Sequence, residues 1–347
     1  MRAQPLPKIS LGQVYHLRWK RRRLLWRCLR ARREMQPVNL QLDHIRPDAI
    51  LAVVVLRNEA VRLPYFLEYY RSLGVDHFLM VDNGSDDGST DILTAQGDVS
   101  LWNTRACYRD ARFGLDWSGW LLMRYGHGHW CLTLDVDELL TYPGVQDHGV
   151  RDLTKVLAAE GRDGFGAMML DLYPKGALGA QDYAPGQDPT EVLMGFDAEP
   201  YRAQRQAPMG NLWLQGGVRE RVFFQHNPQS SPTLNKLPLV RWNRRFAYTN
   251  STHSLLPRHL NTLYNGPLGQ NAPSGVLLHS KFLPDVIAKS EEDTLRQQHF
   301  HNPPKFIPYY AAIASAPDLW HRQTQVYDGP DGLETLGLCK APDWRHL

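Results

Sequence analysis

Cysteine is scarce in this sequence, and long apolar runs are missing. Among the 347 residues the four cysteines are Cys28, Cys107, Cys131 and Cys339, and no two of them form a C-x-x-C pair. This spacing argues against a cysteine zinc site and a disulfide framework, so we expect free thiols. No segment has the roughly 18–20 uninterrupted apolar residues of a membrane-spanning helix, and the N-terminal residues lack a secretory signal pattern. We therefore expect a cytoplasmic chain.

Acidic residues are almost missing from the first 35 positions. That segment holds 11 lysines and arginines but a single acid, Glu34, which leaves 28 basic and 35 acidic residues for the remainder. The segment thus carries about +10 and the rest about −7. Because the larger part is acidic and has no recognition motif, no specific nucleic-acid partner is expected.

The basic segment also has helical apolar spacing. Leu17, Leu24, Leu25, Cys28 and Leu29 recur at near-helical intervals, with tryptophans among the arginines. A basic amphipathic helix of this kind can lie on an anionic membrane surface. The alternative is a disordered tail that aids solubility or attracts polyanions.

Apolar runs from residue 49 onward predict an α/β fold. "AILAVVVL" is typical of a parallel strand buried on both faces. A helical pattern follows and stops at Gly74; "HFLMVD" predicts a second strand, "TDILTAQG" a helix, "VSLW" a third strand and "WCLTL" a fourth. This order favours right-handed crossovers and a mainly parallel sheet flanked by helices.

Polar segments follow three of these strands. They are "RNE" at 57–59, "DNGSDD" at 82–87 and "DVDE" at 135–138. Ligands of open α/β sheets bind outside the carboxyl ends of strands, so we expect these segments to line one site. Asp135 and Asp137 can both reach one Mg²⁺ or Mn²⁺ ion, which takes its other ligands from water and phosphates. The pattern predicts a clamp of metal and diphosphate.

Together these motifs resemble the family 2 glycosyltransferases of the GT-A fold, in a bacterial branch with RNE, DNGSDDGS and D-x-D-E segments. The resemblance is clear from about Ile50 to Tyr142 and looser beyond, and residues 1–48 and 173–212 lie outside it. It implies a GT-A type sheet, with a more irregular C-terminal part on the acceptor side. It also implies a nucleotide-sugar site in which Asn58, Glu59 and Asp82 hold the nucleoside, while Asn83 and Ser85 shape the loop of Asp82.

The same resemblance assigns the metal to Asp135 and Asp137. Many enzymes of this fold add a late histidine, for which His279 in "LLHSKF" is the first choice and His253 the second. A lone histidine is more often a satisfied polar residue than a ligand.

The sequence offers several candidate residues for the phosphate contacts and for the catalytic base. Arg219 and Arg221 alternate on a predicted strand, "GGVRERVFF", and would share one face for phosphate or acidic-sugar contacts, with Lys236 in a similar role. Inverting transfer needs one base, for which the candidates are Glu220, Glu138 and Asp197. On a regular strand Glu220 would point away from the face of Arg219 and Arg221. Glu220 as the base and the two arginines as phosphate contacts therefore cannot both be correct on such a strand. Glu138 could instead support the metal ligands.

The predicted organisation has three parts: a basic arm and linker at 1–48, a glycosyltransferase domain at 49–300 and an extension at 301–347. The donor half of the domain is expected at about 49–142 and the acceptor half at about 143–300.

The predicted function is metal-dependent transfer of a sugar from a nucleotide-sugar, UDP-sugar foremost, to a saccharide or lipid-linked glycan. The expected setting is bacterial surface polysaccharide synthesis, at the inner face of the cell membrane. The alternatives are a phosphohydrolase that uses the D-x-D aspartate as nucleophile, and a nucleotide- or carbohydrate-binding protein without turnover.

Overall fold

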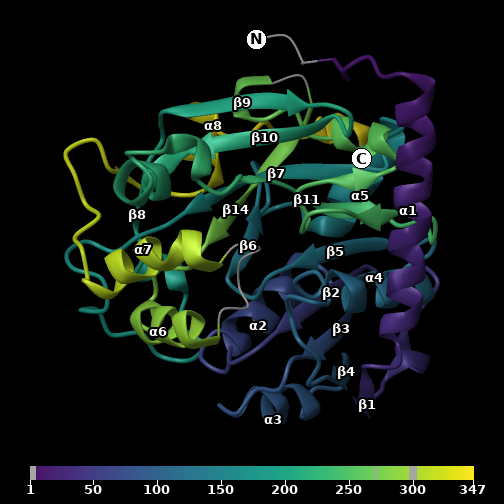
Figure 1. The fold of residues 1–347 in the computed structure, drawn as a ribbon, viewed down its shortest axis with the longest axis horizontal. Coiled ribbons are helices and arrows are strands. Elements are labelled where there is room, and N and C mark those ends of the chain that lie inside the picture. The colour runs from purple at the N-terminus through teal and green to yellow at the C-terminus, as the bar shows by residue number, and fades with distance from the viewer. Residues whose placement is uncertain (1–4, 270–271, 297–302) are drawn as a thin grey trace.

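Within the described residues, nine strands form one sheet (Figure 1). The computed structural model describes residues 5–269, 272–296 and 303–347. The spatial order is β1 (Gln36–Asn39), β4 (Val99–Asn103), β3 (His77–Asp82), β2 (Leu51–Leu56), β5 (Trp130–Leu134), β11 (Asn235–Arg241), β7 (Gly164–Asp171), β14 (Ser274–His279) and β6 (Glu138–Thr141).

Most strands of this sheet run the same way. The pairings orient β4, β3, β2, β5, β7 and β14 together, whereas β1, β11 and β6 run against them. The prediction of an α/β fold with a mainly parallel sheet is confirmed. Each of the four expected strands is present as β2, β3, β4 and β5. Residues 51–56 are buried almost throughout because the sheet is covered on both faces.

Helices lie on both faces of the sheet. The helices of the described residues are α1 (Leu11–Ala31), α2 (Leu63–Leu73), α3 (Ser89–Thr94), α4 (Leu115–Arg124), α5 (Val150–Ala159), α6 (Val286–Arg296), α7 (Pro303–Ala314) and α8 (Pro330–Thr335). The chain steps outward from β2 to β4 through α2 and α3, then returns through α4 to β5. Right-handed crossovers therefore place α4 on the face opposite α2 and α3. Gly74 ends α2 in the left-handed conformation, at φ 103°.

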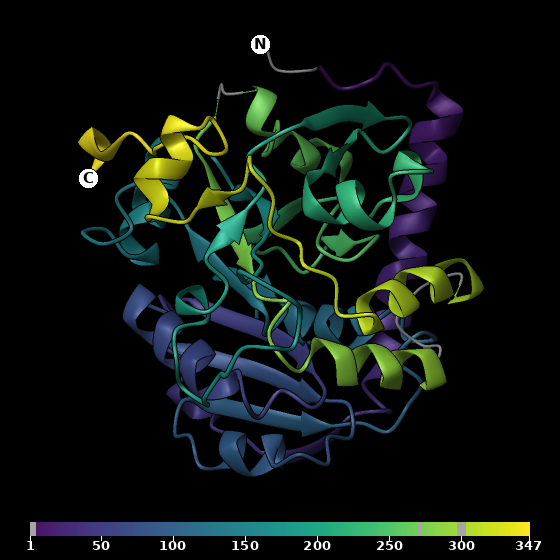
Figure 2. The same cartoon turned by 90° about the vertical axis from the view of Figure 1, so that its left-hand side faces the viewer.

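The C-terminal half adds small irregular sheets to this core. They pair β9 (Tyr201–Gln206) with β10 (Asn211–Gly216), β12 (Ala247–Tyr248) with β13 (Leu255–Leu256), and β8 (Gly195–Phe196) with β15 (Gln325–Val326). Helices α6 and α7 lie side by side at the edge of the molecule (Figure 2). Helix α6 is described to Arg296, and residues 297–302 lie outside the described residues.

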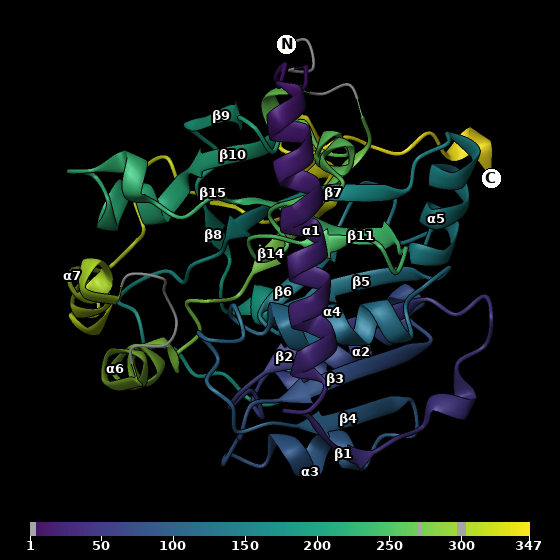
Figure 3. The same cartoon turned by 45° about the vertical axis from the view of Figure 1, so that its right-hand side comes forward.

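Helix α1 packs on the rest of the chain and does not form a free arm. It starts at a capping box between Ser10 and Gln13 and runs across α4 (Figure 3). Leu17 and Leu24 are buried against β12 and β13. Cys28 packs on Gly119, where an added Cβ would lie 2.6 Å from the Cys28 sulfur. Leu17, Leu24 and Cys28, three of the five apolar residues of the predicted membrane face, therefore pack inside the protein, whereas Leu29 is exposed.

Polar contacts extend this packing. Arg27 forms an ion pair with the buried carboxylate of Asp116 at 2.7 Å, and Glu34 accepts a hydrogen bond of 2.8 Å from the Trp117 indole. Part of the expected linker is the edge strand β1, which pairs with β4. None of the helices in the described residues combines the length and apolar composition needed to cross a bilayer.

The packing of α1 can be tested with two matched leucines. Leu24 is 7% exposed and Leu29 is 39% exposed on the same helix. Leu24→Ala should lower the free energy of unfolding by about 2–5 kcal/mol, because it leaves a cavity against β12 and β13. Leu29→Ala should change it by no more than about 0.5 kcal/mol. Urea denaturation measures both, and equal values would show that α1 does not dock as described.

Candidate functional site

Sheet register brings the D-x-D segment to a histidine and a second aspartate. Asp135 follows β5, and Glu138 is the first residue of β6. The antiparallel pairing of β14 with β6 sets His279 opposite Glu138, and the parallel pairing of β14 with β7 sets His279 beside Asp171. The predicted late histidine therefore lies at the same strand ends as the D-x-D.

His279 bridges two carboxylates. Its Nδ1 lies 2.5 Å from Asp171 Oδ1, and its Nε2 lies 3.1 Å from Asp137 Oδ2. Burial would lower the pKa of His279, but the attraction of Asp137 and Asp171 outweighs it and raises the pKa to about 9. Burial would likewise raise the pKa of Asp137, yet His279 and Arg62 hold it well below its usual value.

Lys236 neutralises the other two acids of the motif. Its Nζ lies 2.7 Å from Glu138 Oε1 and 3.2 Å from Asp135 Oδ2, and its side chain is only 4% exposed. Burial raises the pKa of Glu138 to about 7 despite Lys236, and the charges of Asp135 and Asp137 add to the rise. Lys236 and His279 thus place positive charge beside all three acids of the motif. The repulsion between the acids is therefore balanced within the protein, and no metal ion is needed to explain their closeness.

Arg219 completes the buried end of this cluster. Its Nε donates to Asp171 Oδ2 at 2.7 Å, and its Nη2 is buried and finds no hydrogen-bond partner among the described residues. Arg219, Asp171 and His279 therefore form a chain that leads to Asp137. A carboxylate that accepts the second N–H of a ligating histidine fixes the ring and directs its other nitrogen toward a metal.

The separation of Asp137 and His279 suits two neighbouring ligands of one divalent ion. Neighbouring ligands of an octahedral ion with bonds of about 2.1 Å lie about 3 Å apart, which matches the 3.1 Å between Asp137 Oδ2 and His279 Nε2. Asp135 has a half-exposed side chain beside them. No three histidine, cysteine, aspartate or glutamate side chains of the described residues form a complete metal site. Once His279 loses its Nε2 proton, Asp137 and His279 could act as two protein ligands of an ion that completes its shell from water and phosphate oxygens.

The "RNE" segment at the end of β2 is bound to α6. Glu59 Oε1 accepts from Lys289 Nζ at 2.6 Å, and Glu59 Oε2 lies 3.2 Å from Arg62. Arg62, itself buried, also forms a two-pronged ion pair with Asp285 at 2.5 and 2.7 Å. Arg57 reaches Glu292 on the same helix at 3.2 Å. Helix α6 thus covers the loop in which the nucleoside was expected.

The predicted nucleoside residues form one hydrogen-bonded pair of loops. Ser85 Oγ accepts from the Asn58 backbone N–H at 2.9 Å, and Asn58 Oδ1 accepts from the Asp86 N–H at 3.0 Å. Asp82 is fully buried; Ser85 donates twice to one of its oxygens and Thr90 donates to the other. Asn83 donates to two backbone carbonyls. Asp82 and Asn83 hold the loop in this structure, and their contact with a nucleoside stays a prediction.

The predicted strand at "GGVRERVFF" is wrong. Gly216 and Gly217 have φ values of 140° and 69°, which end β10, and Arg219–Phe223 form a π-helical turn. An added Cβ at Gly216 would lie 2.2 Å from the Pro200 carbonyl oxygen, so the glycine is required there. The alternation argument for Arg219 and Arg221 therefore fails, and these two side chains bind different aspartates.

Arg221 and Asp197 belong to a second buried cluster. Arg221 Nε donates to Asp197 at 2.8 Å, and the same carboxylate accepts from Tyr173 at 2.5 Å and lies 3.2 Å from His321 Nε2. Arg221 also donates to the Leu319 carbonyl. Asp197 thus links residues near β8 to the C-terminal segment and has no contact with the D-x-D.

Two other candidates also find partners away from Asp137. Glu220 is bound by Arg202 and accepts a hydrogen bond of 2.8 Å from Ser231. His253 Nδ1 lies 2.5 Å from the Asn235 carbonyl oxygen, and burial with the nearby charge of Lys236 lowers its pKa to about 3. His279 and not His253 is therefore the histidine beside the motif. The assignments of Glu220 and Glu138 as the base stay predictions.

Sequence reasoning missed Asp171, Arg62 and the residues of α6. Asp171 ends the apolar run "GFGAMMLD", in the same way that Asp82 and Asp135 end theirs, so a polar residue at a strand end was an available signal. No comparable signal marks Arg62 or Asp285, because their pairing depends on two segments 223 positions apart in the sequence.

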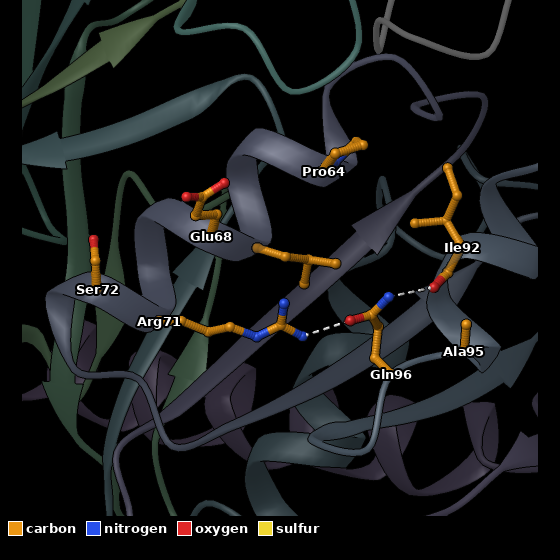
Figure 4. A pocket seen from close by; sticks show the side chains of 8 residues that line it. Pro64, Glu68, Arg71, Ser72, Ile92, Ala95 and Gln96 are labelled. Carbon is orange, nitrogen blue, oxygen red and sulfur yellow. Dashed lines mark hydrogen bonds between the residues drawn. The ribbon is translucent and has the colours of Figure 1, made fainter.

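A groove of about 780 Å³ lies elsewhere, between α2 and α3 (Figure 4). Leu67 and Ile92 line it, and Arg71 is held at its wall by Asp98 and Gln96. It shares no residue with the carboxylate cluster, so it does not define the site.

Comparisons with known proteins leave the family open. No family model matches this chain, and no curated protein matches it. Among solved structures, a 4-diphosphocytidyl-2C-methyl-D-erythritol synthase aligns over 40% of this chain and 65% of its own, at 18% identity and a TM-score of 0.24. A Bacillus anthracis protein named as a glucose-1-phosphate thymidylyltransferase, in complex with a sucrose, aligns over 76% and 83% at 9% identity and a TM-score of 0.28. TM-scores this low carry no argument about activity.

The role of Lys236 predicts a coupled effect on stability. Lys236→Met should lower the free energy of unfolding by about 3–5 kcal/mol, because it leaves Glu138 buried without its cation. Adding Glu138→Gln should restore part of that loss, since it removes the uncompensated charge. Urea denaturation of the two single variants and the double variant gives the coupling. If the losses in the free energy of unfolding of the two single variants add up in the double variant, the pairing of Lys236 with Glu138 would be contradicted.

Proposed function

We propose that this chain is a metal-dependent glycosyltransferase that moves a sugar from a nucleotide-sugar donor, UDP-sugar foremost, to a saccharide or lipid-linked glycan. The observation that carries the proposal is the Asp137–His279 pair, held 3.1 Å apart at the carboxyl ends of the strands. The two predicted nucleoside loops follow β2 and β3 at the same edge and bond to each other. Ligands of open α/β sheets bind at such an edge.

The chain's own residues prepare this edge for a charged donor. Asp171 accepts the Nδ1–H of His279, and Arg219 holds Asp171 in place, so His279 Nε2 faces Asp137. Lys236 and Glu138 fix Asp135 beside them. Asp137 and His279, with Asp135 alongside, would hold a divalent metal that acts as a Lewis acid toward the donor diphosphate.

The proposed reaction is in-line displacement at the anomeric carbon. The acceptor oxygen forms a bond to that carbon, the bond to the diphosphate oxygen breaks, and the nucleoside diphosphate leaves with the electron pair. Inversion follows from a single displacement and requires a base to take the acceptor proton. The setting in bacterial surface polysaccharide synthesis rests on the sequence resemblance.

Substitution of the Asp137–His279 pair tests the function. Asp137→Asn and His279→Gln should each lower turnover of the cognate nucleotide-sugar by about 10²–10³, the usual loss for one catalytic electrostatic contact. Asp152→Asn, on the surface of α5, is the matched control and should keep wild-type turnover. Release of nucleoside diphosphate from a panel of nucleotide-sugars, with titrated Mn²⁺, is the measurement.

Three outcomes of that assay would contradict the proposal. They are full turnover in excess EDTA, an active Asp137→Asn enzyme, and turnover of an aryl phosphate without any turnover of nucleotide-sugars. The last would favour a phosphohydrolase. A fourth contradicting outcome, binding of a nucleotide-sugar without release of product, would favour a binding protein.

A further inference from the structure

Helix α1 carries a second apolar stripe on the face opposite its packed side. Leu11, Tyr15, Trp19, Trp26 and Leu29 recur every three, four or seven residues, so at 100° per residue they fall within an arc of about 80°. Their exposed fractions are 88, 61, 50, 56 and 39%. We call these five residues the outer stripe.

Basic side chains accompany the outer stripe. Arg22 lies over the Trp19 ring at 5.3 Å, and Arg30 lies over the Trp26 ring at 4.7 Å. Arg18, Lys20 and Arg23 are also exposed. Within the described residues, Arg27 is the one cation of α1 that has an acidic partner. The outward face of α1 therefore combines large apolar rings with positive charge that the rest of the protein does not neutralise.

The combination of exposed apolar rings and positive charge favours a lipid surface over a polyanion as the binding partner. Positive charge alone would be enough to bind a polyanion, and it would not explain two half-exposed tryptophans and two leucines on one face of the helix. Tryptophan and tyrosine favour the boundary between lipid headgroups and acyl chains, and each lysine or arginine near an anionic surface adds on the order of a fivefold gain in affinity. Amphipathic helices that lie in this boundary show the same two features.

We propose that the outer stripe of α1 is a docking surface for an anionic membrane. The proposal does not depend on the catalytic activity. It differs in part from the expectation drawn from the sequence: Leu17, Leu24 and Cys28 of the predicted face pack on the protein, and Leu29 alone of that face belongs to the outer stripe.

Docking through the outer stripe would fix the orientation of the whole protein. The inner face of α1 stays packed on α4, so no unfolding or helix release is required. At 1.5 Å per residue the 21-residue helix would lie flat over about 32 Å of membrane. Figure 1 places α1 on the side of the molecule opposite α6 and α7, and α6 binds the loop at the end of β2. The membrane would therefore not cover the carboxylate cluster.

Vesicle flotation with the full chain tests the proposal. The protein should float with vesicles of 70% phosphatidylcholine and 30% phosphatidylglycerol, and not with pure phosphatidylcholine. Arg22→Gln with Arg30→Gln should weaken binding by about 25-fold, at about fivefold for each cation. Arg322→Gln with Arg345→Gln removes the same charge from exposed positions elsewhere and should leave binding unchanged.

The tryptophans provide the second arm of the test. Trp19→Ser with Trp26→Ser should abolish flotation while the melting temperature stays the same, because both rings are exposed. Brominated lipids should quench tryptophan fluorescence in the wild type, and that quenching should be lost in the double variant.

Each of the following results would overturn the proposal. The first is no binding of the wild type to the anionic vesicles. The second is an equal loss of vesicle binding in the Arg22/Arg30 and Arg322/Arg345 double variants, which would indicate that binding depends on net charge and not on the outer stripe. The third is binding to a DNA duplex that exceeds vesicle binding and ignores the tryptophan changes, which would indicate nucleic acid as the partner.

Discussion

Carboxylates buried at a sheet edge need compensating positive charge, and this requirement governs the candidate site. Breaking a buried ion pair by removing one partner typically costs about 3–5 kcal/mol, so these charges are bound to one another as a set. Here Lys236 compensates Glu138, His279 compensates Asp137, and Arg219 compensates Asp171. The acids can therefore be held close together before any ligand arrives.

The same arrangement links stability to the proposed chemistry. The register of β14 between β7 and β6 sets His279 between its two carboxylates. Arg219 reaches Asp171 because Gly216 and Gly217 turn the chain out of β10 into a π-helical turn. A change in any of these supports should alter the orientation of His279 as well as the stability of the fold.

Local patterns in the sequence predict the elements of residues 49–142 well. Strands β2 to β5 are continuous apolar runs, α2 has helical spacing and a glycine stop, and Asp135 marks the end of a strand. These features depend on neighbours in the chain, which a sequence displays directly.

Long-range pairings were not predictable in the same way. His279 and Asp171 are 108 positions apart, and Lys236 and Asp135 are 101 positions apart. Lys236 binds Asp135 and Glu138 in this structure, a pairing that the sequence did not indicate, and its contact with phosphate stays a prediction. Helix α1 was predicted from its spacing, but which of its faces is buried depends on its contact with Gly119 and the β12–β13 pair. Strand register and packing partners determine these contacts and the buried face of α1, and a local sequence pattern does not reveal either of them.

The most direct test of the account is a crystal structure of the chain grown with Mn²⁺ and UDP, with anomalous scattering used to locate the metal. The account predicts a manganese peak within about 2.3 Å of Asp137 Oδ2 and His279 Nε2, with diphosphate oxygens and water in its remaining positions. It also predicts that the uridine lies against the loops that follow β2 and β3. A manganese ion bound elsewhere, or a nucleotide that does not reach this edge of the sheet, would contradict it.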